Sequence, residues 1–183
     1  MFNKNSLRIE ALDKRKNLLI DEIEANSKII VQKVLNFLSQ KKFDSIFSFC
    51  AMPGEVDLSR LIGSVSVPLA YPRIVDHRLE FYKVDSHEQL KKQSFGILEP
   101  WGQLELIHPS PKSVILVPAL LLSRDGARLG MGKGFYDRFL ADYPDCLSIG
   151  VIFDQFLVES LPLDPWDINL YGVCTERRLD IWR

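Results

Sequence analysis

Residues 114–122 read VILVPALLL, and residues 123–134, which follow directly, read SRDGARLGMGKG. An uninterrupted apolar run of nine residues, rich in branched side chains, is typical of a strand buried on both faces. Residues 134–141 have the pattern of a helix, so the glycine-rich segment is a turn from a buried strand into a helix. Such units build parallel sheets covered by helices.

Strand-like and helix-like segments alternate on both sides of this unit. Apolar residues at steps of three, four and seven predict two consecutive helices within residues 5–40, with Ser27 as the N-cap of the second. Helices are also expected at residues 55–62 and after Ser86, where Ser86 and Gln89 have the spacing of a capping box. The remaining strands are expected at residues 44–52, 65–71, 79–84, 147–153 and 172–175. We therefore predict one domain over residues 1–183, a three-layer α/β/α fold with a mainly parallel sheet and helices on both faces.

Composition and charge exclude several classes of protein. With 46% apolar and 26% charged residues over 183 positions, the chain has the composition of a globular domain with a sizeable core. Its 23 Lys and Arg balance 24 Asp and Glu, so no overall field attracts it to nucleic acid or to an anionic membrane, and we expect neither as a partner. A basic excess within residues 4–42 is interpreted as a solvated helix face.

The cysteines and the N-terminus indicate a cytoplasmic protein. Three cysteines without a C-x-x-C pair fit a reducing compartment and offer neither a disulfide framework nor a zinc site. The apolar run at residues 114–122 is far shorter than the roughly 20 residues needed to span a bilayer. The N-terminal segment is charged from residue 4 onward and lacks the apolar stretch of a secretory signal.

The glycine-rich turn is a candidate phosphate site. Glycines let the backbone approach a ligand closely, and the start of the following helix offers unpaired N–H groups to an anion. Arg128 and Lys133 add positive charge beside those groups. Two standard phosphate motifs fail, because a Walker A loop requires Gly at position 127 and a G-x-G-x-x-G motif requires Gly at position 135, where the chain has Ala127 and Phe135. From the residues alone, a nucleotide site and a ligand-free turn are equally supported.

Asp137 lies at the start of the helix that follows this turn. Its carboxylate is close enough to bound phosphates to hold Mg²⁺, which prefers oxygen ligands. An acidic residue in a first helical turn also interacts favourably with the helix dipole, and its position alone favours this second interpretation.

Five sequence blocks, in order, carry a family resemblance. They are KNSLR at residues 4–8, EVD at 55–57, FGILEP at 95–100, RLGMGKGFYDR at 128–138 and LPLDPWD at 161–167. On these blocks the chain resembles the 5-formyltetrahydrofolate cyclo-ligases, also called methenyltetrahydrofolate synthetases, over most of its length. The resemblance implies a reaction that uses ATP and Mg²⁺ to close 5-formyltetrahydrofolate to 5,10-methenyltetrahydrofolate, with release of ADP and phosphate.

The resemblance also implies roles for individual residues. Arg128 and Lys133 are the implied catalytic residues, which stabilise charge on the transferred phosphoryl group. Asp137 and Asp167 are implied to hold Mg²⁺. The implied ATP contacts are Lys4, Arg8, Arg128, Leu129, Gly130, Met131, Gly132, Lys133, Gly134, Phe135 and Tyr136. The implied folate contacts are Cys50, Glu55, Phe95 and Tyr136.

The chain departs from the family pattern at several positions. Phe135 replaces a frequent Tyr, Leu98 a usual Pro and Leu79 a common Met, and Ala119 and Ser123 stand where Gly and Asp are common. These departures leave two other functions open: a diverged ATP-binding enzyme acting on another small molecule, and a binding protein without turnover. In each case we expect a monomer with small-molecule ligands.

Overall fold

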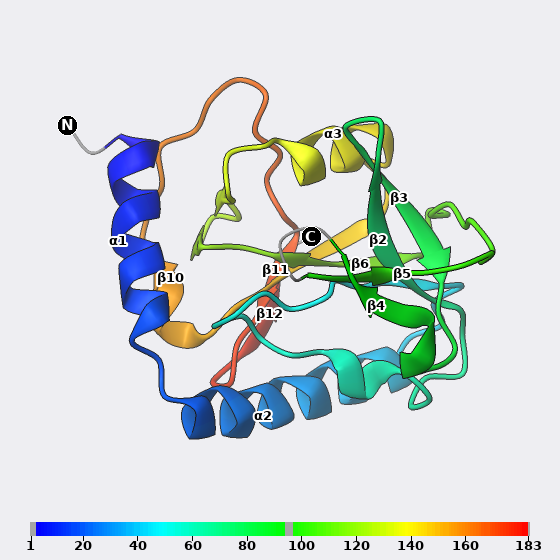
Figure 1. Ribbon diagram of the computed structural model, residues 1–183. Helices are drawn as coiled ribbons and strands as arrows, with labels where there is room; N and C mark the ends of the chain where they lie inside the picture. The colour runs from blue at the N-terminus through cyan, green and yellow to red at the C-terminus, as the bar shows by residue number, and fades with distance from the viewer. Residues whose placement is uncertain (1–2, 94–96, 183) are drawn as a thin grey trace.

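A seven-stranded sheet forms the middle layer of the computed structural model, which describes residues 3–93 and 97–182 (Figure 1). In order across the sheet, the strands are β12 (Leu179–Ile181), β11 (Gly172–Cys174), β9 (Leu147–Val151), β6 (Val114–Pro118), β1 (Ile46–Phe47), β2 (Leu69–Val75) and β3 (Arg78–Lys83). Neighbouring strands are parallel from β11 to β2. The edge strands β12 and β3 are antiparallel to their neighbours. The predicted mainly parallel sheet is confirmed.

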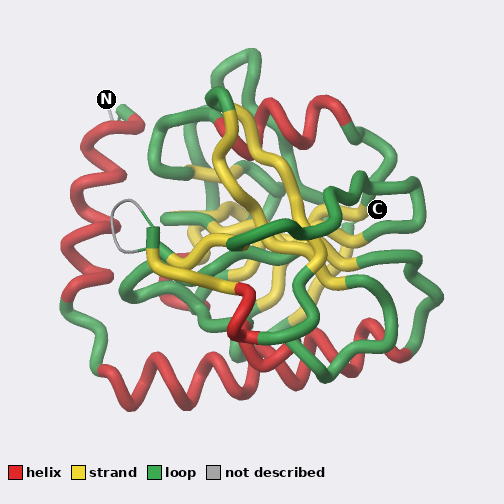
Figure 2. Tube along the Cα trace, turned by 45° about the vertical axis from the view of Figure 1, so that its right-hand side comes forward, coloured by secondary structure: helices red, strands yellow, loops and turns green. Residues whose placement is uncertain are grey.

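Helices lie on both faces of this sheet, as predicted. In Figure 1, α2 (Ile20–Ser39) runs below the sheet and α3 (Phe135–Asp142) lies above it. On α3, the Phe139 ring lies 4.6 Å from that of Phe81 on β3 and 6.3 Å from that of Phe47 on β1, measured between ring centroids. Figure 2 shows α1 (Lys4–Lys16) standing at the side of the molecule. None of the described helices combines the length and apolar character required to cross a membrane.

The predicted pair of N-terminal helices is confirmed, but the predicted cap is wrong. The helix α2 begins at Ile20, with Leu19 as its N-cap and acidic residues in its first turn. Ser27 is buried within the helix, and its Oγ accepts a hydrogen bond from the backbone N–H of Asp57 at 3.1 Å. The hydroxyl therefore links α2 to a loop instead of starting a helix.

The helix predicted at residues 55–62 is mostly absent. The segment forms turns and one short 3₁₀ helix, η1 (Ser59–Leu61). Its acidic side chains accept hydrogen bonds from nearby backbone groups, since Glu55 Oε2 binds the N–H of Met52 at 3.0 Å and Asp57 Oδ1 binds that of Ser59 at 2.8 Å. Such local bonds stabilise turns in competition with a helix. The capping box at Ser86, by contrast, is confirmed and starts the 3₁₀ helix η2 (His87–Gln89).

The apolar run at residues 114–122 is divided between two sheets. The strand β6 ends at Pro118, which has no N–H with which to continue the hydrogen-bond ladder. The chain then enters β7 (Leu121–Ser123), which pairs with β8 (Arg128–Leu129) and β10 (Leu157–Val158) in a separate three-stranded sheet. This crossing places the glycine-rich turn at the carboxyl end of the central strands.

The strand expected at residues 44–52 is reduced to β1 (Ile46–Phe47), and the remaining boundaries differ from prediction by a few residues. Strand β2 begins at Leu69 and not at residue 65, and β9 ends at Val151, before a further 3₁₀ helix, η4 (Asp154–Phe156). A small two-stranded sheet of β4 (Leu90–Lys92) and β5 (Leu98–Pro100) was not predicted.

Candidate functional site

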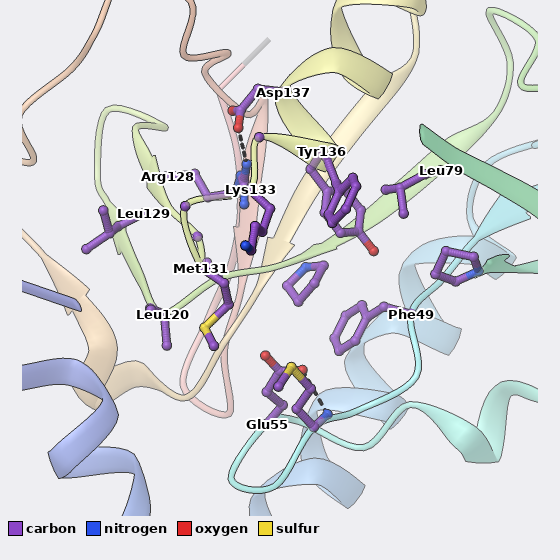
Figure 3. Close-up of a pocket in the computed structure, with 18 of the residues that line it drawn as sticks. Phe49, Glu55, Leu79, Leu120, Arg128, Leu129, Met131, Lys133, Tyr136 and Asp137 are labelled. Atoms are coloured by element: carbon purple, nitrogen blue, oxygen red, sulfur yellow. Dashed lines mark hydrogen bonds and ion pairs between the residues drawn. The ribbon is translucent and has the colours of Figure 1, made fainter. Parts of the chain in front are cut away.

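One cavity of about 500 Å³ lies where α1, the glycine-rich turn and the segment after β1 meet (Figure 3). Nearly all of the residues nominated from the sequence line it. They are Lys4, Arg8, Cys50, Glu55, Arg128, Leu129, Gly130, Met131, Gly132, Lys133, Gly134, Phe135, Tyr136, Asp137 and Asp167. Phe95, the remaining nominated residue, lies outside the described residues. Sequence blocks more than a hundred residues apart are therefore brought to one cavity.

The glycine-rich turn has a backbone that other residues would strain. Gly132 and Gly134 have φ angles of 87° and 64°, in the left-handed region that glycine adopts without penalty. Gly134 is also the N-cap of α3 and lines the cavity. The first turn of α3, whose N–H groups have no partner within the helix, therefore lies at the cavity wall. Arg8 on α1 donates from Nε to the carbonyl oxygen of Gly130 at 3.0 Å and fixes the turn against the helix.

Arg128 is a buried cation beside this turn. Its Nη2 donates to Asp137 Oδ2 at 2.8 Å, an ion pair drawn as a dashed line in Figure 3. Its Nε has no hydrogen-bond partner among the described residues. A Cβ at Gly130 would lie 2.5 Å from Arg128 Nη1, so a larger residue there would displace the guanidinium. The cavity wall thus holds a guanidinium with unused donor capacity, which suits an anionic ligand.

Lys4 connects the start of α1 to the segment that contains Asp167. Its Nζ donates to Asp164 Oδ2 at 2.7 Å and also contacts Asp167 Oδ2. Partial burial opposes the positive charge, but the hydrogen bonds to the two carboxylates outweigh it and raise the pKa of Lys4. Lys4 is therefore held as a cation at the cavity.

Asp137 and Asp167 are the nominated metal ligands, and each is already paired with a cation. Among residues 3–93 and 97–182, no group of three or more His, Cys, Asp or Glu side chains is arranged to hold a metal ion. Mg²⁺ in nucleotide enzymes, however, commonly uses one or two carboxylates and takes its other ligands from phosphates and water. Both carboxylates line the same cavity, so they fit an ion that is bound together with phosphates and do not fit one that is bound by protein side chains alone.

The opposite end of the cavity is mainly apolar and holds the carboxylate of Glu55. Figure 3 shows Phe49 and Tyr136 on facing sides of the space above Glu55. Only 9% of the Glu55 side chain is exposed, and it accepts hydrogen bonds from Arg15 Nη1 at 2.9 Å and from the N–H of Met52 at 3.0 Å. Burial raises the pKa of Glu55, whereas the charge of Arg15 lowers it. A flat apolar ring with N–H donors at its edge matches this end of the cavity.

Cys50 lies in the same wall as an unreactive thiol. Burial raises its pKa to about 12, and the negative charges of Glu99 and Asp57 act in the same direction. Because the thiolate is the reactive form, this thiol is a poor nucleophile and serves as part of the cavity wall.

Several cavity residues were not nominated from the sequence. The apolar ones include Phe49, Met52, Leu79 and Leu120, and Glu99 adds a further carboxylate. The rule that ligands bind at the carboxyl ends of parallel strands could have found Phe49 and Met52, which follow β1 directly. No sequence pattern marked Arg15 as part of the site, because its partner Glu55 is 40 residues away in the chain.

Comparisons with known proteins agree with one another. The model of the 5-formyltetrahydrofolate cyclo-ligase family matches residues 1–176. The 5-formyltetrahydrofolate cyclo-ligase of Haemophilus influenzae is 27% identical over 180 residues, covering 93% of this chain and 96% of that protein. That of Escherichia coli K12 is 31% identical over 144 residues, covering 73% and 79%. The NMR structure of Aquifex aeolicus 5,10-methenyltetrahydrofolate synthetase is similar with a TM-score of 0.87 and 33% identity, covering 98% of this chain and 93% of that one.

Proposed function

Because the chain belongs to the 5-formyltetrahydrofolate cyclo-ligase family, we propose that it uses ATP to close 5-formyltetrahydrofolate to 5,10-methenyltetrahydrofolate, with release of ADP and phosphate. The observation that carries this proposal is a cavity with a cationic glycine-rich wall at one end and the carboxylate of Glu55 among apolar side chains at the other. A triphosphate and a pterin ring require these two environments side by side.

The reaction takes two steps. The formyl oxygen attacks the γ-phosphorus of ATP, and the bond from that phosphorus to ADP breaks. The folate nitrogen N10 then attacks the activated formyl carbon, the C–O bond breaks, and the oxygen leaves as part of phosphate while N10 loses its proton. Because N10 belongs to the same molecule, holding the folate in one conformation lowers the entropic barrier.

The cationic wall binds the triphosphate and stabilises the transferred phosphoryl group. Arg128 and Lys133 are placed in the catalytic role because both side chains line the cavity and charge on the transferring group is the main feature to stabilise. Lys4 and Arg8 contact ATP from α1, and the backbone of residues 129–136 lines the phosphates. Arg128 and Lys4 can exchange their carboxylate partners for phosphate oxygens, which leaves those carboxylates available.

Asp137 and Asp167 are the residues that would hold Mg²⁺. Both carboxylates line the cavity, and both are paired with cations that a triphosphate also attracts. When bound with ATP, the ion would neutralise charge on the phosphate oxygens.

The apolar end of the cavity binds the folate ring. Glu55 accepts hydrogen bonds from the pterin N–H and amino groups, which are donors that suit a carboxylate. Tyr136 and Phe49 supply flat apolar surface, and Cys50 forms part of the wall. Phe95 remains in the proposal as a further ring contact.

We also propose that the protein acts as a monomer in the cytoplasm. Cys50, Cys146 and Cys174 are free thiols, as is usual in a reducing compartment. Light scattering of the purified protein would contradict the monomer if it gave twice the mass of the chain.

The function is tested with purified protein, MgATP and 5-formyltetrahydrofolate. The expected result is growth of the near-ultraviolet absorbance of methenyltetrahydrofolate, and a loss of about 10²- to 10³-fold in turnover for Lys133→Ala, since removal of one transition-state donor has effects of that size. Lys112→Ala, which removes an exposed lysine outside the cavity, is the matched control and should be neutral. Calorimetric binding of ATP and folate without product would instead identify a binding protein.

A further inference from the structure

Three cations of α1 lie on one face of the helix and differ in burial. Lys4, Arg8 and Arg15 are separated by four and seven residues, which brings them to the same side. Lys4 and Arg8 line the cavity, whereas Arg15 lies behind its wall with only 7% of its side chain exposed. The partner of Arg15 is Glu55, which is itself 9% exposed and lines the cavity.

We propose that Arg15 is the positioning residue of Glu55, and that it holds this carboxylate in one orientation against the pterin ring. The inference rests on the proposed function, because that function assigns the pterin to Glu55. No contact between Arg15 and substrate is involved.

The geometry fixes the carboxylate from two sides. Arg15 Nη1 donates to Glu55 Oε1 at 2.9 Å, and the Met52 N–H donates to Glu55 Oε2 at 3.0 Å. The guanidinium is itself anchored, since its Nη2 donates to the carbonyl oxygen of Ala119 at 2.6 Å, directly after β6. Glu55 is thereby tied to the central strand of the sheet through Arg15, and a rigidly held acceptor binds a ligand with less loss of freedom.

The loop before Glu55 is shaped around Arg15. Gly54 has a φ of 77°, and a Cβ there would lie 2.3 Å from Arg15 Cγ. The loop therefore runs over the arginine stem at a distance that only glycine permits. This close approach indicates that the position of Arg15 and the course of the loop toward Glu55 depend on each other.

Stability alone does not account for such a pair. Burying two charges costs desolvation free energy that their attraction only partly returns, and well-packed apolar residues often serve as well. A pair that presents one carboxylate to a cavity and keeps its cation behind the wall has a further consequence, because it delivers an oriented acceptor to a ligand.

Arg15 also governs the charge of Glu55. Burial favours the neutral acid, and the charge of Arg15 opposes it. The other ionisable groups around this end of the cavity include Tyr136 on α3, Cys50 after β1 and Glu99 on β5. Burial raises the pKa of all three, and Tyr136 and Cys50 therefore remain neutral near pH 7. Without Arg15, Glu55 is therefore protonated at a higher pH and loses acceptor capacity.

A double-mutant cycle tests the coupling. The proteins are wild type, Arg15→Met, Glu55→Gln and the double variant, and the measured quantity is kcat/KM for 5-formyltetrahydrofolate at saturating MgATP. We expect Arg15→Met to lower this value about tenfold or more with KM for ATP unchanged, and the double variant to match Glu55→Gln alone, because residues that act as a unit are not additive. Lys14→Met, which removes an exposed cation from the same helix, is the matched control and should be neutral.

The pH profile separates positioning from a merely structural role. In Arg15→Met, the acid limb of kcat/KM for the folate should move to higher pH, and Arg15→Lys should restore it in part, because lysine keeps the charge but not the two-pronged geometry. If Arg15→Met does not fold, the pH profile of Arg15→Lys still tests the positioning role. Its acid limb should then lie at a pH somewhat higher than in the wild-type protein.

Two results would overturn the inference. The positioning role is contradicted if the effects of Arg15→Met and Glu55→Gln on kcat/KM simply multiply in the double variant. It is also contradicted if the acid limb of the pH profile does not move in Arg15→Met. Either result leaves the proposed function intact. Absence of turnover in the folded wild-type protein contradicts the proposed function and the positioning role together.

Discussion

At the residue scale, the absence of a side chain at Gly126 lets the turn before the cavity pack closely against the backbone of Leu170. The φ of Gly126 is 90°, and a Cβ would lie 2.4 Å from the carbonyl oxygen of Leu170, whose N–H donates to the Gly126 carbonyl at 2.9 Å. Gly102 has a φ of 87°, but no atom lies within 4 Å of its Cβ position. We expect Gly102→Ala to lower the free energy of unfolding by about 1 kcal/mol and Gly126→Ala by about 3 kcal/mol, because the second adds a backbone clash to the same strain. Urea unfolding measures both, and equal losses would contradict the clash.

Cys50 leads to a prediction about reactivity. A free thiol is partly ionised at pH 8, whereas burial raises the pKa of Cys50 to about 12, so almost none of it is thiolate at that pH. Iodoacetamide at pH 8 should therefore alkylate Cys50 about a hundredfold more slowly in the native protein than in urea, as measured by peptide mass spectrometry. The urea-unfolded chain is the internal control. Equal rates in the two states would show that Cys50 is exposed or activated.

At the scale of elements, α1 and α2 are held by different forces. The described buried residues of α1 are Ala11 and Arg15, and the helix is attached through ion pairs and hydrogen bonds of Lys4, Arg8 and Arg15. By contrast, α2 buries Ile30, Val31 and Val34 in the core. We expect α1 amides to exchange with deuterium faster than those of α2, because few apolar contacts oppose local opening.

Nucleotide should change this difference. MgATP that binds Lys4 and Arg8 adds contacts to α1 and none to the buried face of α2, so exchange should slow mainly in α1. Hydrogen exchange followed by mass spectrometry with and without MgATP measures both helices in one experiment. Protection that appears equally in both, or in α2 alone, contradicts a nucleotide contact on α1.

The elements that could be predicted are those with enough residues to show a pattern. The long periodic segment at residues 5–40 and the apolar run from residue 114 gave two helices and the central strand. Strands β8 and β10 have two residues each, and they pair with β7 across the chain. No local periodicity exists over two residues, so the second sheet could not be predicted. The helix expected at residues 55–62 does not form, because Glu55 and Asp57 accept hydrogen bonds from backbone N–H groups of the surrounding turns. Glu55 also pairs with Arg15, a partner that is distant in the sequence.

At the scale of the whole molecule, the site was predictable where it is written in continuous sequence blocks. The residues from Arg128 to Asp137 are contiguous, and their glycines and charges indicated an anion site before any fold was known. Arg15 could not be found in this way, because its contacts with Glu55 and Ala119 span 40 and 104 residues. A residue that acts through distant partners becomes visible only when the sheet brings those partners together.

The same long-range ties lead to a prediction about cooperativity. Trp101 follows β5, Trp166 precedes Asp167, and Trp182 follows β12, so tryptophan fluorescence reports on three separate regions. The seven-stranded sheet, the hydrogen bond from Arg73 on β2 to the Pro100 carbonyl and the contact of Lys4 with Asp164 link these regions. Fluorescence and far-ultraviolet circular dichroism should therefore give one coincident urea transition. MgATP at about 100 times its Kd should raise the free energy of unfolding by about 2.7 kcal/mol by mass action and move both signals together.

Lys133→Ala is the variant that separates folding from binding in this experiment. Because Lys133 is exposed, its loss should leave the transition without ligand unchanged, whereas the shift caused by MgATP should shrink or vanish. Two separate transitions in the wild-type protein would contradict a single domain. A full MgATP shift in Lys133→Ala would instead place the triphosphate away from the glycine-rich turn, while leaving the single domain untouched.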